Sequence, residues 1–159
     1  MQPITYSVSK GLRTGAIGGF IGSIVLGITG EIGSLAMNQE LFYTTIATKM
    51  GFADSSVLGG WTLHFLVGII AGSLFIGATA AIRMFALTTT KKGVWVGVLG
   101  GIAVWLVVYV PVTAILLPAD LTDATFAGGT FVLHLLYGVV TAIVSLSLLR
   151  RAVKTKTTA

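Results

Sequence analysis

Four long apolar runs constrain this chain more than any other feature of its sequence. They cover residues 15–37, 61–82, 93–117 and 128–149. At a helical rise of about 1.5 Å per residue, roughly 20 apolar residues are needed to cross the ~30 Å of hydrocarbon in a bilayer. Because lipid offers the backbone no hydrogen bonds, such runs are expected to be helices. The sequence therefore predicts an all-α fold: an integral membrane four-helix bundle.

The overall composition excludes a water-soluble globule. Only 9% of the 159 residues are charged and the mean hydropathy is +0.97, whereas soluble domains carry about 25% charged residues. A soluble fold of this length would expose too much apolar surface to remain monomeric. The absence of cysteine also excludes disulfides, thiolate metal sites and cysteine nucleophiles. We expect residues 1–159 to form a single membrane domain.

The basic residues predict the orientation of this domain. Nine of the ten fall on one side of the membrane, and Lys49 alone falls on the other. The nine are Lys10, Arg13, Arg83, Lys91, Lys92, Arg150, Arg151, Lys154 and Lys156. Because cytoplasmic loops are enriched in Lys and Arg, we expect a multi-pass plasma-membrane protein with both termini in the cytoplasm and residues 150–159 as a cytoplasmic tail. The net charge of +5 then reflects topology and contact with the lipid bilayer, and no nucleic-acid partner is expected.

The first outer connection, residues 38–60, has a helical pattern of its own. Phe42, Ile46 and Met50 recur at four-residue spacing, with Asn38 as a candidate cap and Gly51 as a candidate stop. This predicts a short interfacial helix on the outer surface of the bilayer. The second outer connection is brief, and Asp123 or Thr122 can cap the last helix.

An internal repeat is visible in the sequence. Residues 63–68 read LHFLVG and residues 133–138 read LHLLYG, seventy positions later. The glycines of the first and third apolar runs align at an offset of 82. Since each hairpin would start on the same side, we expect two tandem helical hairpins related as a parallel repeat.

Small residues recur every four positions along the apolar runs. Lipid tails do not drive helices together by the hydrophobic effect, so such stripes indicate close backbone packing between helices. The predicted packing positions are Gly15, Gly19, Gly27, Gly68, Gly72, Gly97, Gly101 and Gly138.

Polar side chains inside the apolar runs mark the candidate functional residues, because ionisable groups are costly in lipid. We expect Glu31, His64, His134 and Thr113 to lie at similar depth toward the outer side, with Glu31 paired to His64 or His134. Three interpretations of this polar cluster are open. The carboxylate and a histidine can satisfy each other structurally, they can handle protons or cations, or the two histidines can bind haem b or copper.

The paired LHFLVG and LHLLYG segments, together with the glycine-rich opening at residues 15–19 (GAIGG), resemble small four-helix prokaryotic membrane proteins of the YagU-like type. The resemblance implies a multi-pass membrane protein without an assigned reaction. No GxSxG, HExxH or Walker motif occurs.

We therefore expect a non-enzymatic protein without a cofactor that acts through helix packing. It would be a homo-oligomer or an accessory subunit beside other membrane subunits. The alternatives are a small proton- or cation-handling transporter or channel element, and a redox subunit that binds haem b or a metal.

Overall fold

The computed structural model describes residues 6–52 and 56–157, with side chains as far as residue 152, and these residues form helices and no strand. The elements in order are α1 (Val8–Ala36), α2 (Phe42–Lys49), α3 (Ser56–Ala81), η2 (Arg83–Phe85), α4 (Thr90–Val104), η3 (Trp105–Tyr109), α5 (Val110–Leu116), α6 (Pro118–Thr122) and α7 (Ala124–Thr157). Within the described part of the chain, four helical segments are long and apolar enough to cross a membrane: Val8–Ala36, Ser56–Ala81, Thr90–Leu116 and Ala124–Ala152. The all-α prediction is confirmed, and each of the four predicted apolar runs lies largely in one of these long helical segments.

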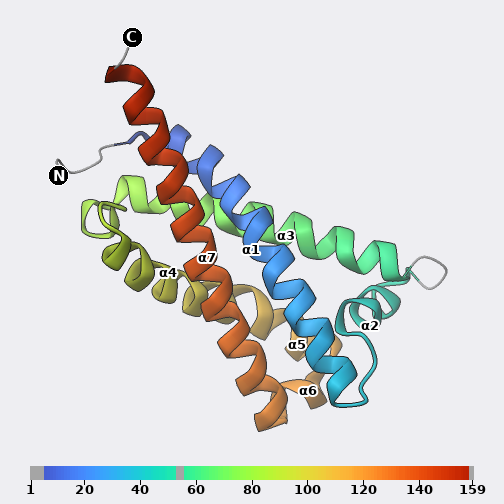
Figure 1. Cartoon of the computed structure of the whole chain (residues 1–159). Coiled ribbons are helices and arrows are strands. Elements are labelled where there is room, and N and C mark those ends of the chain that lie inside the picture. Colours follow the sequence, from blue (N-terminus) through green and yellow to red (C-terminus); the bar gives the residue numbers. More distant parts are fainter. Residues whose placement is uncertain (1–5, 53–55, 158–159) are drawn as a thin grey trace.

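The four long segments pack in a fixed order. α1 lies between α3 and α7, and α7 lies between α1 and α4. Figure 1 shows α3 and α4 meeting at the turn that contains η2 and then diverging. The short helices α2, α5 and α6 lie at the opposite end from the two termini. We call the end that carries α2, α5 and α6 the distal end, and the end that carries the termini the proximal end.

Glycines let α1 and α3, and likewise α4 and α7, approach closely. A Cβ atom on Gly72 of α3 would lie 2.5 Å from the Cα of Gly19 and 2.6 Å from the carbonyl oxygen of Gly15, both on α1. Between α4 and α7, a Cβ atom on Gly138 of α7 would collide with the carbonyl oxygen of Gly97 and lie 2.8 Å from the Cα of Gly101. A side chain at these positions is therefore incompatible with the observed helix separation.

The remaining predicted packing glycines lie in comparable surroundings. A Cβ atom on Gly68 would lie 2.5 Å from that of Ser23, and one on Gly27 would lie 2.7 Å from the ring of Trp61. All eight glycines of the predicted stripes thus face another helix of the same chain.

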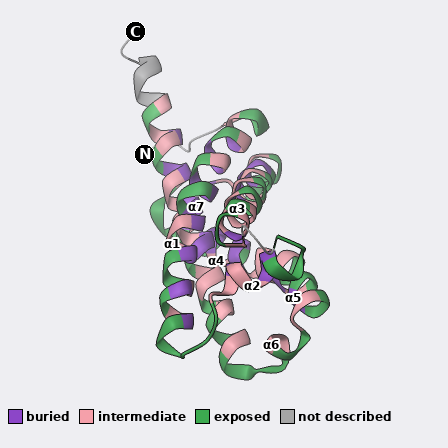
Figure 2. Ribbon diagram, turned by 90° about the vertical axis from the view of Figure 1, so that its right-hand side faces the viewer, coloured by how far each residue is buried: buried purple, intermediate pink, exposed green. Residues whose placement is uncertain are grey.

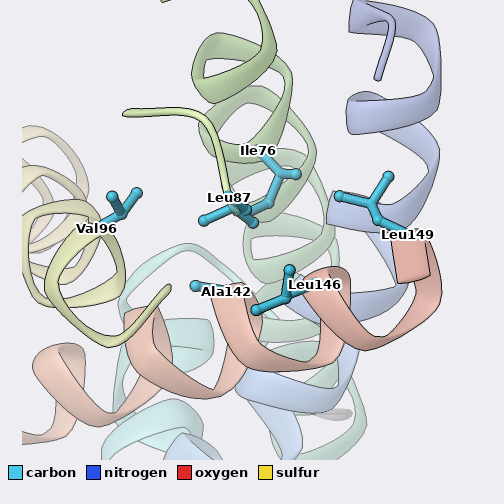
Figure 3. Packing of buried hydrophobic residues seen from close by; sticks show 6 residues of the cluster. All are labelled: Ile76, Leu87, Val96, Ala142, Leu146 and Leu149. Atoms are coloured by element: carbon cyan, nitrogen blue, oxygen red, sulfur yellow. The ribbon is translucent and has the colours of Figure 1, made fainter. Parts of the chain in front are cut away.

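Hydrogen bonds from side chains to backbone carbonyls link α7 to the first hairpin. Ser145 Oγ donates to Thr14 O at 3.0 Å, and Tyr137 OH donates to Gly68 O at 2.6 Å. An apolar cluster near the proximal end contains Ile76, Leu87, Val96, Ala142, Leu146 and Leu149 (Figure 3). Buried residues concentrate where the long helices face one another, and exposed residues cover much of the remaining surface (Figure 2).

Several helix ends differ from the sequence prediction. α1 begins at Val8 because Ser7 Oγ accepts from the amide of Lys10, and α7 continues as a helix to Thr157.

Asp123 caps α7 as predicted, since its Oδ1 accepts from the amides of Thr125 and Phe126. Gly51 follows α2 with a φ of +95°, which suits a residue that ends a helix. The prediction of Asn38 as the cap of α2 is wrong, because α2 starts four residues later, at Phe42.

The third long helical segment contains a π-helical stretch, η3, which ends two residues before Pro111. The amide of Val110 donates to the carbonyl of Trp105, five residues earlier. Proline has no amide hydrogen and disturbs the regular ladder of hydrogen bonds, so a local change of helix type next to it is physically reasonable. The segment turns Tyr109 into the protein, where it is only 5% exposed.

Candidate functional site

Glu31 fixes the short helix α2 at the distal end. Its side chain is 7% exposed, and its two carboxylate oxygens accept from the amides of Phe42 (3.1 Å) and Tyr43 (3.2 Å). These amides belong to the first turn of α2, where backbone donors have no partner within the helix and a carboxylate is favoured by the helix dipole. Glu31 therefore acts as the cap of α2, which supplies no side-chain cap of its own.

Tyr43 extends this arrangement to His64 on α3. The two ring centroids are 4.1 Å apart with an interplanar angle of 33°. Burial raises the pKa of the Tyr43 phenol above its ordinary value, and the negative charge of Glu31 raises this pKa further. The phenol therefore stays protonated. Because Glu31 holds the amide of Tyr43, it also sets where this ring lies against His64.

The two histidines bind different backbone carbonyls through different ring nitrogens. His64 Nε2 lies 2.8 Å from Ser23 O, and His134 Nδ1 lies 2.7 Å from Thr130 O. A carbonyl oxygen only accepts, so these nitrogens carry the proton. In a neutral ring the other nitrogen is then an acceptor. His64 Nδ1 and His134 Nε2 thus remain available to a donor.

Two hydroxyl groups near the histidines are buried and unpaired. Tyr109 OH and Thr113 Oγ1 have no hydrogen-bond partner among the residues that the structure describes. Thr113 is fully buried, and the ring of Tyr109 lies 5.5 Å from that of His134. Leaving a buried hydroxyl unpaired costs about 1–3 kcal/mol, so such groups are uncommon in native folds.

These side chains line one cavity at the distal end. It has a volume of about 220 Å³. Its polar lining comes from His64, His134, Tyr109 and Thr113, with Tyr43 beside them. The other lining residues are Leu26, Phe42, Ile46, Met50, Gly60, Leu63, Val67, Val108 and Val112. We call this space the histidine cavity. It lies where α3 and the η3–α5 segment have diverged and α2 covers the gap.

A second cavity of about 430 Å³ adjoins the first. The two share Leu26, Phe42, Tyr43, Tyr109 and His134 as walls. The remaining walls come mostly from α1 and α7. Most of these residues are apolar or glycine, and the polar ones are Thr29, Ser34, Thr125 and Thr130. We call it the apolar cavity. Among the residues that the structure describes, none with a charged side chain lines either cavity.

The structure brings together three of the four predicted polar residues. His64, His134 and Thr113 line the histidine cavity, whereas Glu31 lies outside it and bonds to the amides of α2. The expected Glu31–histidine pair is thus replaced by a carboxylate cap. The sequence alone did not identify Tyr43 and Tyr109 as residues of the site. Tyr109 could have been found, because it lies two residues before Pro111 within an apolar run.

The donor set of the histidine cavity does not match a zinc centre. Across the described ranges, no three His, Asp or Glu side chains come together as metal ligands. Two neutral imidazoles fall short of the three or four protein ligands of a zinc site. The proton-handling interpretation loses its main support as well, because it depended on a direct contact between Glu31 and a histidine.

Comparison of the sequence with protein-family models, with curated proteins and with solved structures gives no match. The resemblance to YagU-like proteins therefore stays a prediction, and the site itself is the basis for any functional conclusion.

Proposed function

We propose that this chain is a non-enzymatic membrane protein that binds a small neutral molecule in the histidine cavity. The observation that carries the proposal is the pair of buried, unpaired hydroxyls of Tyr109 and Thr113, in a wall that also holds two histidine acceptors. A bound molecule with polar groups would pair these side chains and remove the cost of burying them alone.

The ligand is neutral because the cavity has no means to balance a charge. Its walls, as far as the described residues form them, contain no Lys, Arg, Asp or Glu, and the nearby carboxylate of Glu31 is already bonded to two amides. An ion taken out of water into such surroundings would lose its hydration without an opposite charge to replace it.

The proposed topology places both termini in the cytoplasm and the distal end at the outer side of the plasma membrane, with α2 at the interface. The basic residues support this, because Lys10, Arg13, Lys91 and Arg150 belong to the proximal ends of the helices. The cavity would then be reached from the outer half of the bilayer.

We also propose that the two hairpins are a parallel repeat. Gly19 packs on Gly68 in the first hairpin as Gly97 packs on Gly138 in the second. In this correspondence Gly68 and Gly138, on the second helices of the hairpins, are 70 residues apart, as expected. Gly19 and Gly97, on the first helices, are 78 residues apart, which is one helical turn less than the expected 82.

The protein would serve as a homo-oligomer or as an accessory subunit that holds this molecule for a larger membrane complex. Its interface would use surfaces other than the glycine stripes, since all eight glycines are used in packing within one chain. Apolar residues such as Leu74 and Ile115, which are 63% and 78% exposed, remain for lipid or other subunits.

A small phenol tests the binding proposal. The full chain in nanodiscs is heated with and without p-cresol, a neutral ring with one hydroxyl. At a free concentration of 100 times Kd, ligand binding stabilises the folded state by about 2.7 kcal/mol, and we expect a matching rise in Tm. Leu63→Trp, which fills the histidine cavity, should abolish the rise.

The matched control is Leu66→Trp on the same helix. Leu66 lies outside the cavity and is 50% exposed, so this variant should respond as the parent does. The control also accounts for p-cresol dissolved in the lipid. An equal rise in all three proteins, or no rise in the parent, would contradict the proposal.

A further inference from the structure

We infer that the ligand is a six-membered ring with two oxygen substituents and an apolar tail: the chemical class of benzoquinols and benzoquinones. The inference rests on the proposed binding function and names the molecule that the two adjoining cavities fit best. It concerns binding alone and requires no electron transfer within this chain.

The size of the histidine cavity fits one substituted ring. Its volume is about 220 Å³, whereas a buried cavity of about 150 Å³ is large enough to bind benzene. Aromatic side chains frame the space. The rings of Phe42 and Tyr109 lie 6.3 Å apart, and Tyr43 stacks on His64. A flat ring can pack against these faces in offset or edge-to-face geometry.

The polar groups of the cavity match both states of such a ring. A quinol has two O–H donors, and His64 Nδ1 and His134 Nε2 are two acceptors without a partner in the described structure. A quinone has two carbonyl acceptors, and the hydroxyls of Tyr109 and Thr113 are two unpaired donors. The same walls therefore offer partners to the ring before and after loss of its two hydrogens.

The apolar cavity provides space for the tail. It continues from the histidine cavity past Leu26, Phe42 and His134, with a volume of about 430 Å³. A fatty acid or a phospholipid could also fill an apolar space. Each would bring a charged head group, however, and within residues 6–52 and 56–152 no Lys or Arg lines either cavity. A neutral head group on an apolar tail is the better match.

The test uses the full chain in nanodiscs with a decyl-substituted benzoquinone, its quinol and decanoate. Binding is followed by displacement of p-cresol and by quenching of tryptophan fluorescence, since the cavity wall packs against Trp61 and Trp105. We expect both decyl rings to bind at least about tenfold more tightly than p-cresol, because the tail and a second oxygen add contacts, and decanoate not to compete.

Two variants assign the polar partners. Thr113→Val keeps the shape of the side chain and should weaken quinone binding about tenfold with a smaller effect on the quinol. His134→Phe should weaken quinol binding by about tenfold or more. If His134→Phe does not fold, the Thr113→Val comparison alone still decides the assignment.

The outcomes separate the two proposals. If p-cresol stabilises the parent but neither decyl ring displaces it, the ligand class is wrong and the binding cavity stands. If decanoate competes as well as the rings do, a neutral head group is wrong. If no compound binds, including p-cresol, both proposals fail.

Discussion

Thr113 and Tyr109 are the residues at which this molecule departs most clearly from the rule that buried polar groups are paired. Other buried hydroxyls, such as those of Ser145 and Thr79, bond to backbone carbonyls. Thr44 Oγ1 of α2 also lacks a partner among the described residues, but Thr44 does not line the histidine cavity. The hydroxyls of Tyr109 and Thr113 both belong to residues that line the histidine cavity. A ligand bound there can therefore offset the free-energy cost of burying them without a partner. A binding site held open in this way gains affinity at the expense of stability.

Replacing Thr113 by Val should therefore stabilise the ligand-free protein by about 1 kcal/mol, because an unpaired hydroxyl is replaced by a methyl group of similar size. Thr79→Val is the matched control. The Thr79 hydroxyl is buried too, but it bonds to Ile76 O at 2.7 Å and to Tyr6 OH at 2.8 Å, so its loss should cost about 1 kcal/mol or more. Thermal unfolding in nanodiscs measures both. A loss of stability in Thr113→Val would show that its hydroxyl is paired in solution.

Glu31→Gln should loosen α2. The amide side chain has one carbonyl oxygen, so it can accept from Phe42 or Tyr43 in the present geometry but not from both in the same way, and the charge near the helix dipole is lost. We expect a cost on the order of 1–2 kcal/mol and faster amide exchange within α2. Glu40→Gln is the control, since Glu40 is exposed and accepts from the hydroxyl of Thr45 and not from a backbone amide of α2. Unchanged exchange in Glu31→Gln would mean that the cap does not hold α2.

The polar residues of the site could be chosen from the sequence, but their partners could not. Ionisable groups are rare in apolar runs, so Glu31, His64 and His134 stand out without any structure. The partners of Glu31 are amides of a separate helix, and any residue type can supply an amide. Side-chain chemistry therefore suggested a histidine, whereas the docking of α2 decided the outcome.

At the scale of elements, each hairpin is held by glycines that allow backbones to touch, and the spans themselves follow from hydropathy alone. Length and apolar character suffice to locate a helix in lipid, because the backbone has no alternative to internal hydrogen bonds. The π-helical segment η3 and the placement of α2 do not follow from these rules. They depend on how Pro111 and Glu31 meet their tertiary surroundings.

Two glycines of α7 provide a matched test of the packing. Gly138→Ala should destabilise the protein by about 1–3 kcal/mol, since the new Cβ would meet the backbone of α4 at Gly97 and Gly101. Gly128→Ala should be neutral or stabilise by up to about 1 kcal/mol, because no atom lies within 4 Å of its Cβ position and alanine favours a helix. Unfolding of both variants in nanodiscs gives the comparison. Equal effects would contradict close packing at Gly138.

At the scale of the whole molecule, the absence of native cysteine allows the orientation to be tested directly. Cysteine introduced at Ser56 or Asp123, at the distal end, should react with an impermeant maleimide in intact cells. Cysteine at Thr89, which caps α4 at the proximal end, should react only after the membrane is opened. Labelling of Thr89→Cys in sealed cells would reverse the proposed orientation and place the histidine cavity on the cytoplasmic side.

The position of α1 between α3 and α7 has a consequence for biosynthesis. The α1 face that carries Gly18 meets Thr141 and Ser145 of α7, and α7 leaves the ribosome after the other three long helices. During synthesis this face of α1 therefore remains without its partner, α7, until more than a hundred further residues have been made. α1 and α3 can pack together early, whereas the cavity walls from η3, α5 and α7 are assembled only after α7 has been synthesised. A ligand present in the membrane at that moment would meet a site that forms around it.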